Sequence, residues 1–109
     1  MKYIVITGAS KGIGFQIANY LANKRGFSII NISRSNSKSK KILNLNCNIG
    51  DYNDVKKVFS KIKKIDVLIN NAAISFFSKN NIKNFEEIIK TNLNGTFYCA
   101  HEAIKKLKK

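Results

Sequence analysis

The feature that most constrains this chain is a glycine-rich turn near its N-terminus. Residues 7–14 (TGASKGIG) follow a β-branched stretch at 2–7 and open a stretch with apolar residues at helical spacing. Gly8 permits a tight turn, Gly12 permits close approach of a diphosphate, and Gly14 permits the helix to pack on the sheet. The free N–H groups at the helix start would then face a phosphate. The run therefore predicts a strand–turn–helix that binds a dinucleotide, in preference to a turn with no ligand.

Strands and helices alternate along the rest of the chain. Apolar residues at helical spacing predict three helices. The first runs from Gly12 to about Lys24, with Gly26 as its stop signal. The second begins after Asp51, which can cap it, and the third covers roughly 81–108. Short apolar runs predict strands at 2–7, 27–32, 42–47 and 65–69, and the gap from 34 to 42 is short enough to be a loop. Such alternation predicts one α/β domain over 1–109, a Rossmann-type doubly wound parallel sheet that ends after about four strands.

Three motifs resemble those of the short-chain dehydrogenase/reductase family, in the family's order and spacing. Residues 7–14 are similar to its TGxxxGxG cofactor motif, residues 66–73 (DVLINNAA) to its fourth-strand NNAG motif, and residues 90–97 (KTNLNGTF) to its helix motif around the active-site asparagine. The resemblance implies an NAD(P)-binding oxidoreductase that interconverts carbonyls and alcohols. The candidate cofactor-binding residues are then Gly8, Ser10, Lys11, Gly12, Ile13, Gly14, Arg34, Asn48, Ile49, Asn71, Ala72 and Ala73.

The choice of cofactor can be argued from charge. NAD enzymes of this architecture place an acid after the second strand, whereas a cation there suits the 2′-phosphate of NADP. This chain has Arg34 at that point with no Asp or Glu nearby, and Lys11 lies inside the glycine turn. Arg34 can form a forked pair with the phosphate. We expect NADP(H) in preference to NAD(H); the alternative is that both cations are solvated surface charges.

Two residues depart from the family pattern. Asn48 stands where the family usually has an Asp that accepts a hydrogen bond from the adenine amine, and its side-chain oxygen is expected to serve instead. Ala73 replaces the last glycine of NNAG and adds a methyl group where backbone is expected near the cofactor. Neither change is expected to abolish binding.

The resemblance also implies which catalytic groups are missing. The family's serine, tyrosine and lysine lie after a fifth strand, whereas this sequence ends at Lys109, so we expect Asn92 to be the only member of the set present and the chain alone to be inactive. The spacing YxxxK occurs at Tyr20 and at Tyr52, both in the wrong place and attributable to chance. Asn71 is expected to tie neighbouring strands together.

Truncation after four strands has a consequence for folding. The fourth strand is expected to be an unpaired edge, and the last helix to carry a bare apolar stripe, which favours association. In the family this helix contributes to a dimer interface, so a homo-oligomer through the last helix is expected. A small carbonyl or alcohol substrate would require a C-terminal half.

Composition restricts the other functions. The net charge is +14, from 20 Lys and Arg against 6 Asp and Glu, yet only Arg25 and Arg34 are arginines. Arginine is the usual reader of base edges, so nucleic-acid binding is a weaker alternative. Cys47 and Cys99 lack metal-ligand spacing and are expected to be buried free thiols, with no metal site.

No targeting or membrane segment is recognisable, so a cytoplasmic location is expected. Two readings of function remain open beside nucleic-acid binding. The chain is the cofactor-binding half of an NADPH-dependent oxidoreductase, or it is a non-catalytic nucleotide-binding module.

Overall fold

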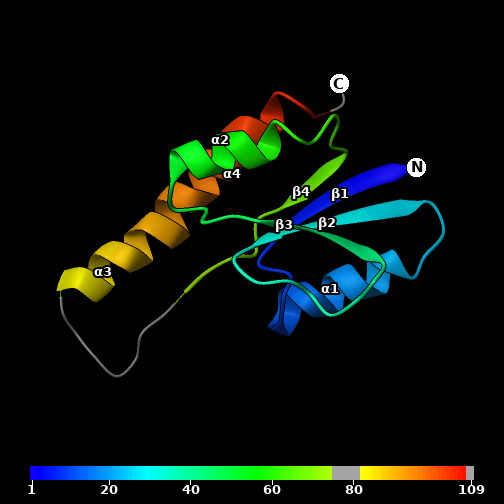
Figure 1. The fold of residues 1–109 in the computed structure, drawn as a ribbon, viewed down its shortest axis with the longest axis horizontal. Coiled ribbons are helices and arrows are strands. Elements are labelled where there is room, and N and C mark those ends of the chain that lie inside the picture. The colour runs from blue at the N-terminus through cyan, green and yellow to red at the C-terminus, as the bar shows by residue number, and fades with distance from the viewer. Residues whose placement is uncertain (75–81, 108–109) are drawn as a thin grey trace.

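The fold is built on one parallel sheet with helices on both faces (Figure 1). The computed structural model describes residues 1–74 and 82–107. Its elements are, in order, β1 (Lys2–Thr7), α1 (Gly12–Ala22), β2 (Phe27–Ser33), β3 (Ile42–Asn46), α2 (Tyr52–Phe59), β4 (Val67–Ile69), α3 (Ile82–Ile89), the π-helix η1 (Lys90–Gly95) and α4 (Thr96–Ile104). The strand order is β3-β2-β1-β4, with each neighbouring pair parallel. This confirms the predicted Rossmann-type doubly wound sheet.

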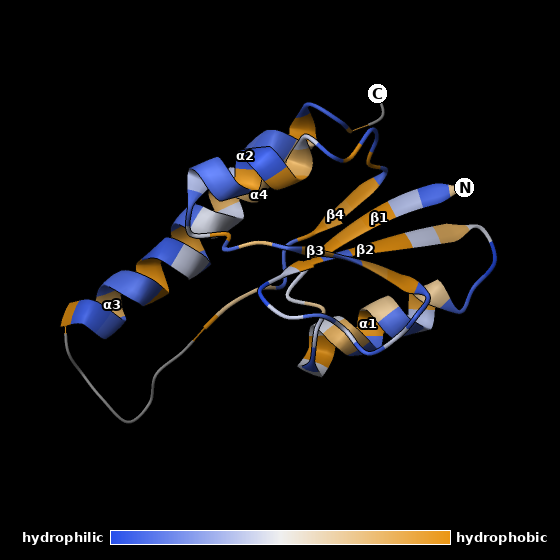
Figure 2. Cartoon of the chain, viewed as in Figure 1, coloured by the Kyte–Doolittle hydropathy of each residue, from blue (hydrophilic) through white to orange (hydrophobic). Residues whose placement is uncertain are grey.

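The central strand β1 is buried on both of its faces. Ile4 and Ile6 pack with Ala18 of α1, whereas Val5, between them, belongs to the cluster that α2 and α4 cover on the other face. Alternate side chains of a strand point to opposite faces, so an unbroken apolar run suits a strand covered on both sides. Figure 2 shows the strands as the most continuously hydrophobic elements, while the helices carry mixed faces.

The first crossover helix is shorter than predicted. It ends at Ala22 and not near Lys24, because Asn23 takes the C-cap position and its side-chain amide donates to the Asn19 carbonyl at 2.7 Å. Gly26, predicted to stop the helix, instead adopts φ +88° where the chain enters β2. The connection from β2 to β3 is a loop, as the short spacing predicted.

The last helix was predicted as one piece over roughly 81–108, and the described residues are helical without a break from Ile82 to Ile104, so the helix ends earlier than predicted. The segment divides into α3, the π-helical η1 and α4, with a turn at 105–106. Residues 81 and 108 lie outside the described part of the chain. The π-helical η1 contains Asn92, the residue that the family resemblance assigns to the catalytic set. Figure 1 shows α3 and α4 roughly in line, with α3 extending beyond the sheet.

The apolar stripe predicted on this last segment is present and exposed. Four of its members are more than 60% exposed: Phe85, Leu93, Phe97 and Ile104. The opposite side of α4 packs on the sheet instead, through the fully buried Cys99 and Ala103.

The edge at β4 differs from the prediction. The strand is shorter than the expected 65–69 and pairs with β1. On its other side, Ile65 forms a single parallel bridge with Leu107, and the Ile65 amide donates to the Lys106 carbonyl at 3.1 Å. In the described residues, β4 itself therefore has no strand beside its outer edge. The turn after α4 contacts the chain at Ile65, just before β4 begins.

Candidate nucleotide-binding site

A cleft of about 430 Å³ lies at the carboxyl ends of the strands, a size typical of small-molecule sites. Ten of the twelve predicted cofactor-binding residues line it: Gly8, Ser10, Lys11, Gly12, Arg34, Asn48, Ile49, Asn71, Ala72 and Ala73. Ile13 and Gly14 are not among its lining residues, and neither is Asn92. In open α/β sheets ligands bind outside the carboxyl ends of the strands, so this cleft is the candidate site.

The three glycines of the turn serve different geometric needs. Gly8 adopts φ +70°, and a Cβ there would lie 2.8 Å from the Ala72 Cα. A Cβ on Gly14 would overlap the Asn71 side-chain amide and the Gly8 carbonyl oxygen, so Gly14 acts in packing and does not line the cleft. Gly12 adopts φ +64° with nothing within 4 Å of a Cβ position, so the space beside it is open.

Hydrogen bonds hold the turn against two strands. The Thr7 hydroxyl accepts from the Asn71 and Ala72 amides, each at 3.0 Å. The Asn71 side-chain amide in turn donates to the Gly8 carbonyl at 3.1 Å. Asn71 therefore ties the end of β1 to the segment after β4, the structural role predicted for it.

The start of α1 lies at the cleft, where Lys11 and Gly12 line the wall, and it has no side-chain cap. Its N-cap residue is Lys11, whose side chain makes no capping hydrogen bond, and its first turn has no acidic residue. The first N–H groups of a helix have no partner within the helix and carry the positive end of its dipole. This uncapped end beside the open space at Gly12 fits a phosphate group.

The second cationic group of the cleft is Arg34. Its Nη2 donates to the Asn48 Oδ1 at 3.2 Å, and the Gly50 amide donates to the same oxygen at 3.1 Å. Both Arg34 and Lys11 line the cleft and are exposed. The two donors use the acceptor that the sequence argument assigned to the adenine amine, so Asn48 orients Arg34 in this structure.

A buried amide network fixes the loop that carries Arg34. Asn31, only 1% exposed in β2, accepts from the Ala9 amide of the glycine turn at 2.9 Å. Its own amide donates to the Asn44 Oδ1 on β3 at 2.9 Å, and that oxygen also accepts from the Ser37 amide and hydroxyl. The glycine turn and the 34–41 loop are thus linked through the side chains of Asn31 and Asn44. Sequence reasoning missed Asn31, although a polar residue within an apolar strand is a signal for such a role.

Six further residues of the cleft were also missed: Ile32, Ser33, Ser35, Cys47, Ile74 and Thr91. Five of them could have been found, since they adjoin predicted positions or end a predicted strand. Thr91 also adjoins a predicted residue, but the motif assigned the role to Asn92, which does not line the cleft.

Asn92 clamps the chain next to the cleft. Its Oδ1 accepts from the Ile74 amide and its Nδ2 donates to the Ile74 carbonyl, both at 2.8 Å. Because Ile74 lines the cleft and Asn92 does not, Asn92 shapes the wall through the backbone of another segment.

The two thiols are not activated, and the two tyrosines with the YxxxK spacing lie away from the cleft. Burial raises the pKa of Cys47 and of Cys99 to about 12, so both stay protonated at neutral pH. Neither Tyr20 nor Tyr52 lines the 430 Å³ cleft.

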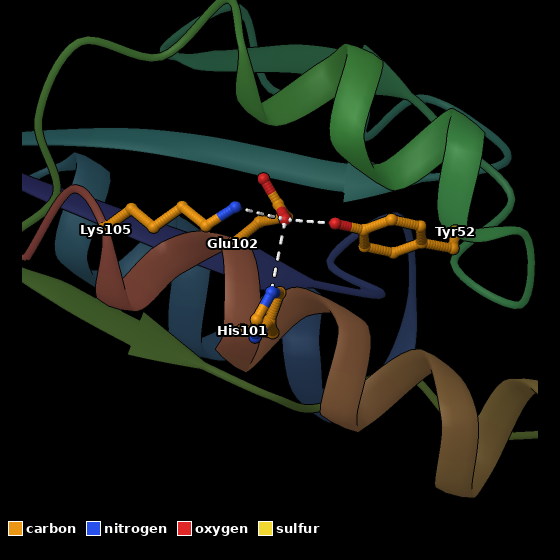
Figure 3. Close-up of polar contacts among 4 residues, drawn as sticks. All are labelled: Tyr52, His101, Glu102 and Lys105. Atoms are coloured by element: carbon orange, nitrogen blue, oxygen red, sulfur yellow. Dashed lines mark hydrogen bonds and ion pairs between the residues drawn. The ribbon is translucent and has the colours of Figure 1, made fainter.

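Tyr52 is engaged elsewhere (Figure 3): its hydroxyl donates to the Glu102 carboxylate at 2.7 Å, which raises the tyrosine's pKa. The same carboxylate accepts from Lys105 at 2.9 Å and lies 3.9 Å from the His101 Nε2. This cluster joins α2 to α4, so the YxxxK spacing at Tyr52 has a structural explanation.

Two further observations concern residues 1–74 and 82–107. None of their helices is long and apolar enough to cross a membrane. They also bring together no group of three or more His, Cys, Asp or Glu side chains that could hold a metal ion.

Comparison with known proteins defines the class. The family model for short chain dehydrogenases matches residues 2–109. The chain is 36% identical to the 3-oxoacyl-(acyl-carrier-protein) reductase FabG of Rickettsia typhi, over 97% of this chain and 48% of that protein. Its fold matches the ligand-free aldohexose dehydrogenase of Thermoplasma acidophilum with a TM-score of 0.90 and 30% identity, over 97% of this chain and 44% of the other.

A third relative was solved with a cofactor. The fold matches a short chain dehydrogenase of Leptospira borgpetersenii with bound NAD+ at a TM-score of 0.82 and 27% identity, over 95% of this chain and 45% of that one. The sheet is thus that of a Rossmann-type fold. The chain belongs to the short-chain dehydrogenase family, whose members are oxidoreductases that bind nicotinamide dinucleotides, and it spans about half the length of the relatives it matches.

Proposed function

We propose that this chain binds NADP(H) as the cofactor-binding half of an oxidoreductase that interconverts carbonyls and alcohols. The observation that carries the proposal is the convergence of an uncapped helix start, Lys11 and Arg34 on one cleft. When bound, the nicotinamide supplies hydride transfer. The residues of this chain bind and orient: the first turn of α1 receives the diphosphate, and Arg34 and Lys11 receive the 2′-phosphate.

Charge supports NADP(H) over NAD(H). Arg34 follows β2 directly, and the described residues that line the cleft include no acidic side chain. Its guanidinium is already held by Asn48, so little conformational entropy is lost when it pairs with a phosphate. One relative carries NAD+, so both cofactors have to be measured.

The test is a pair of titrations, NADP+ and NAD+, on the wild type and on Arg34→Ala. A charge-assisted pair contributes about 1.5–3 kcal/mol, so NADP+ affinity should fall roughly ten- to hundredfold while NAD+ affinity changes less than about twofold. Arg25→Ala is the matched control, since it removes the other arginine, from the segment between α1 and β2. Equal losses for both cofactors would mean that Arg34 contacts the base or ribose and does not read the 2′-phosphate.

Catalysis is proposed to need groups that this chain does not contribute to the cleft. No tyrosine is found among the cleft-lining residues that the structure describes, and both Cys47 and Cys99 have raised pKa values. The 109-residue chain should therefore bind NADPH without oxidising it in the presence of a panel of aldehydes and ketones. Turnover by the purified chain would contradict this part of the proposal and show that a proton donor is present.

Self-association is proposed through the exposed stripe on α3, η1 and α4. Phe85, Leu93, Phe97 and Ile104 are all more than 60% exposed, and α3 has no buried residue. Isolated apolar side chains are common at surfaces, but a row along one helical segment indicates an interface. Leu93→Glu together with Phe97→Glu should shift the protein towards monomer in analytical ultracentrifugation; an unchanged oligomeric state would remove this stripe as the interface.

A further inference from the structure

Thr91 has a buried hydroxyl with no partner. Its Oγ1 is the one buried side-chain nitrogen or oxygen atom in the described residues that makes no hydrogen bond, and the residue is 6% exposed. A helical threonine commonly donates to the carbonyl four residues earlier, and Thr96 does so, to the Asn92 carbonyl at 2.8 Å. A buried hydroxyl without a bond is costly, so its presence here calls for a partner that binds.

Thr91 lies in the wall between two cavities. It lines the 430 Å³ cleft and also a neighbouring polar cavity of about 340 Å³. Asn48 is the only other residue that lines both among those described. The two segments pack closely, since a Cβ on Gly50 would lie 3.3 Å from the Lys90 backbone. Thr91 is therefore on the β3 side of the cleft, next to the residue that was expected to read the adenine.

Asn48, which was expected to accept a hydrogen bond from the adenine amine, already has partners within the chain. The Asn48 Oδ1 accepts from Arg34 and from the Gly50 amide, which accounts for the two lone pairs of a carbonyl oxygen. A nucleotide anchored by its diphosphate at α1 and by its 2′-phosphate at Arg34 would extend its base towards the segment after β3. There the hydroxyl of Thr91 is the polar group left unpaired.

We propose that Thr91 is the residue that reads the adenine edge of the bound nucleotide, an inference that rests on the proposed function. A hydroxyl can donate to the adenine N1 or accept from the N6 amine, and adenine presents both on one edge. Binding then supplies the bond that the free protein lacks. Thr91 thus contributes to affinity for the base, while Arg34 sets the preference between NADP and NAD.

The test compares Thr91→Val with Thr91→Ser in the full chain. Valine keeps the shape and removes the hydroxyl, so NADP+ should bind about three- to tenfold more weakly, whereas serine should bind within about twofold of the wild type. The same titrations use the 1,N6-etheno derivative of NADP+, in which both atoms of the edge are blocked. For that derivative Thr91→Val should change the affinity less than about twofold.

Stability of the free protein gives an independent measurement. Thr91→Val removes an unpaired buried hydroxyl, so the unfolding temperature without ligand should stay the same or rise. Thr96→Val is the matched control: it removes a hydroxyl that is bonded within the chain and is absent from the cleft, so it should lower the unfolding temperature and leave NADP+ affinity unchanged.

Each other outcome is decisive. Equal weakening of NADP+ and its etheno derivative by Thr91→Val would show a role in shape and overturn the inference, as would a fall in unfolding temperature like that of Thr96→Val. Wild-type binding of NADP+ with no effect of Thr91→Val would overturn this inference alone. Failure of the wild type to bind NADP+ would overturn the proposed function, and this inference with it.

Discussion

The starts of α1 and α2 are alike in topology and opposite in chemistry. Both follow a strand at the carboxyl edge of the sheet. The α2 start is closed by its own chain, because the Asp51 side chain accepts from the Asn53 amide at 3.0 Å and from the Asp54 amide at 3.4 Å. The α1 start has Lys11 at the N-cap, with no side-chain capping bond. The donors of one helix are satisfied internally, whereas those of the other remain available for a ligand.

Charge follows the same division. Asp54 lies in the first turn of α2, where a negative charge favours the helix dipole. The first turn of α1 has no acid, and Lys11 and Arg34 stand beside it in the cleft. A helix start without a stabilising acid is expected where an anion takes that place, which supports the proposal that a phosphate binds at the start of α1.

The largest expected effect on NADP+ affinity comes from placing a negative charge at the start of α1. Gly12→Asp places a carboxylate in the open space where the diphosphate is proposed to bind, so NADP+ affinity should fall more than about a hundredfold through repulsion and lost access to the amides. Isothermal titration calorimetry would measure the loss. Gly26→Asp is the matched control, since Gly26 also has a positive φ and open space around its Cβ position but does not line the cleft.

Strain alone cannot produce this pattern. Gly12 and Gly26 have φ +64° and +88°, so aspartate should reduce stability at both sites by about 1 kcal/mol or more. If both variants lost NADP+ affinity to the same degree, the loss would come from destabilisation, and the contrast between the two helix starts would not explain binding.

The second prediction concerns the α2 cap. Asp51→Ala removes the side chain that satisfies two amides, so the free energy of unfolding should fall by about 0.5–2 kcal/mol, measured by urea denaturation. Affinity for NADP+ should change less than about twofold.

Lys11→Asp is expected to have the opposite effects on stability and on affinity. It supplies a cap to α1, so stability should stay equal or rise. It also places a negative charge at the proposed phosphate site, so NADP+ affinity should fall more than about tenfold. A loss of stability in Lys11→Asp would mean that the α1 start is held in a geometry that no side chain can cap.

The difference between the starts of α1 and α2 could largely be predicted from the sequence. The glycines and the Asp51 cap were predicted because each depends on residues close in the chain, where turn chemistry and capping act. The four strands were also found, since a strand buried on both faces is a continuous apolar run.

What the sequence could not supply are the contacts between distant segments. Asn31 reaches the glycine turn across 22 residues, and Asn48 turns to Arg34 where the motif had assigned it to adenine. The π-helix at Lys90–Gly95 interrupts a pattern that is otherwise helical, so periodicity alone predicted one long helix. The unpaired Thr91 hydroxyl is likewise a property of packing, since a threonine in a helix ordinarily finds a carbonyl of its own chain.

The smallest effect is expected from the link that anchors α2 to α4. Burial tends to raise the pKa of Glu102, but hydrogen bonds from Lys105 and Tyr52, with the charges of Lys105 and His101, outweigh it and hold the pKa below its ordinary value of 4.5. A carboxyl whose pKa is lower in the folded state contributes stability that is fully present above 4.5 and is lost as the pH falls through the lower folded value. Glu102→Gln should therefore be less stable than the wild type at pH 7, by less than the loss in Asp51→Ala, and the difference should shrink as the pH is lowered below 4.5.

Urea denaturation at a series of pH values measures the free energy of unfolding of the variant and of the wild type. The difference between the two removes the contribution of the other carboxyls, which titrate in both proteins. Tyr52→Phe is the matched variant, because it removes one hydrogen bond and leaves the charge of Glu102 in place, so most of its acid sensitivity should persist. Neither variant should change NADP+ affinity at pH 7, since neither residue lines the cleft. If the difference in stability between Glu102→Gln and the wild type stayed constant with pH, then shape, and not charge, would join α2 to α4. A change in NADP+ affinity in either variant would mean that the contact between α2 and α4 is coupled to the cleft.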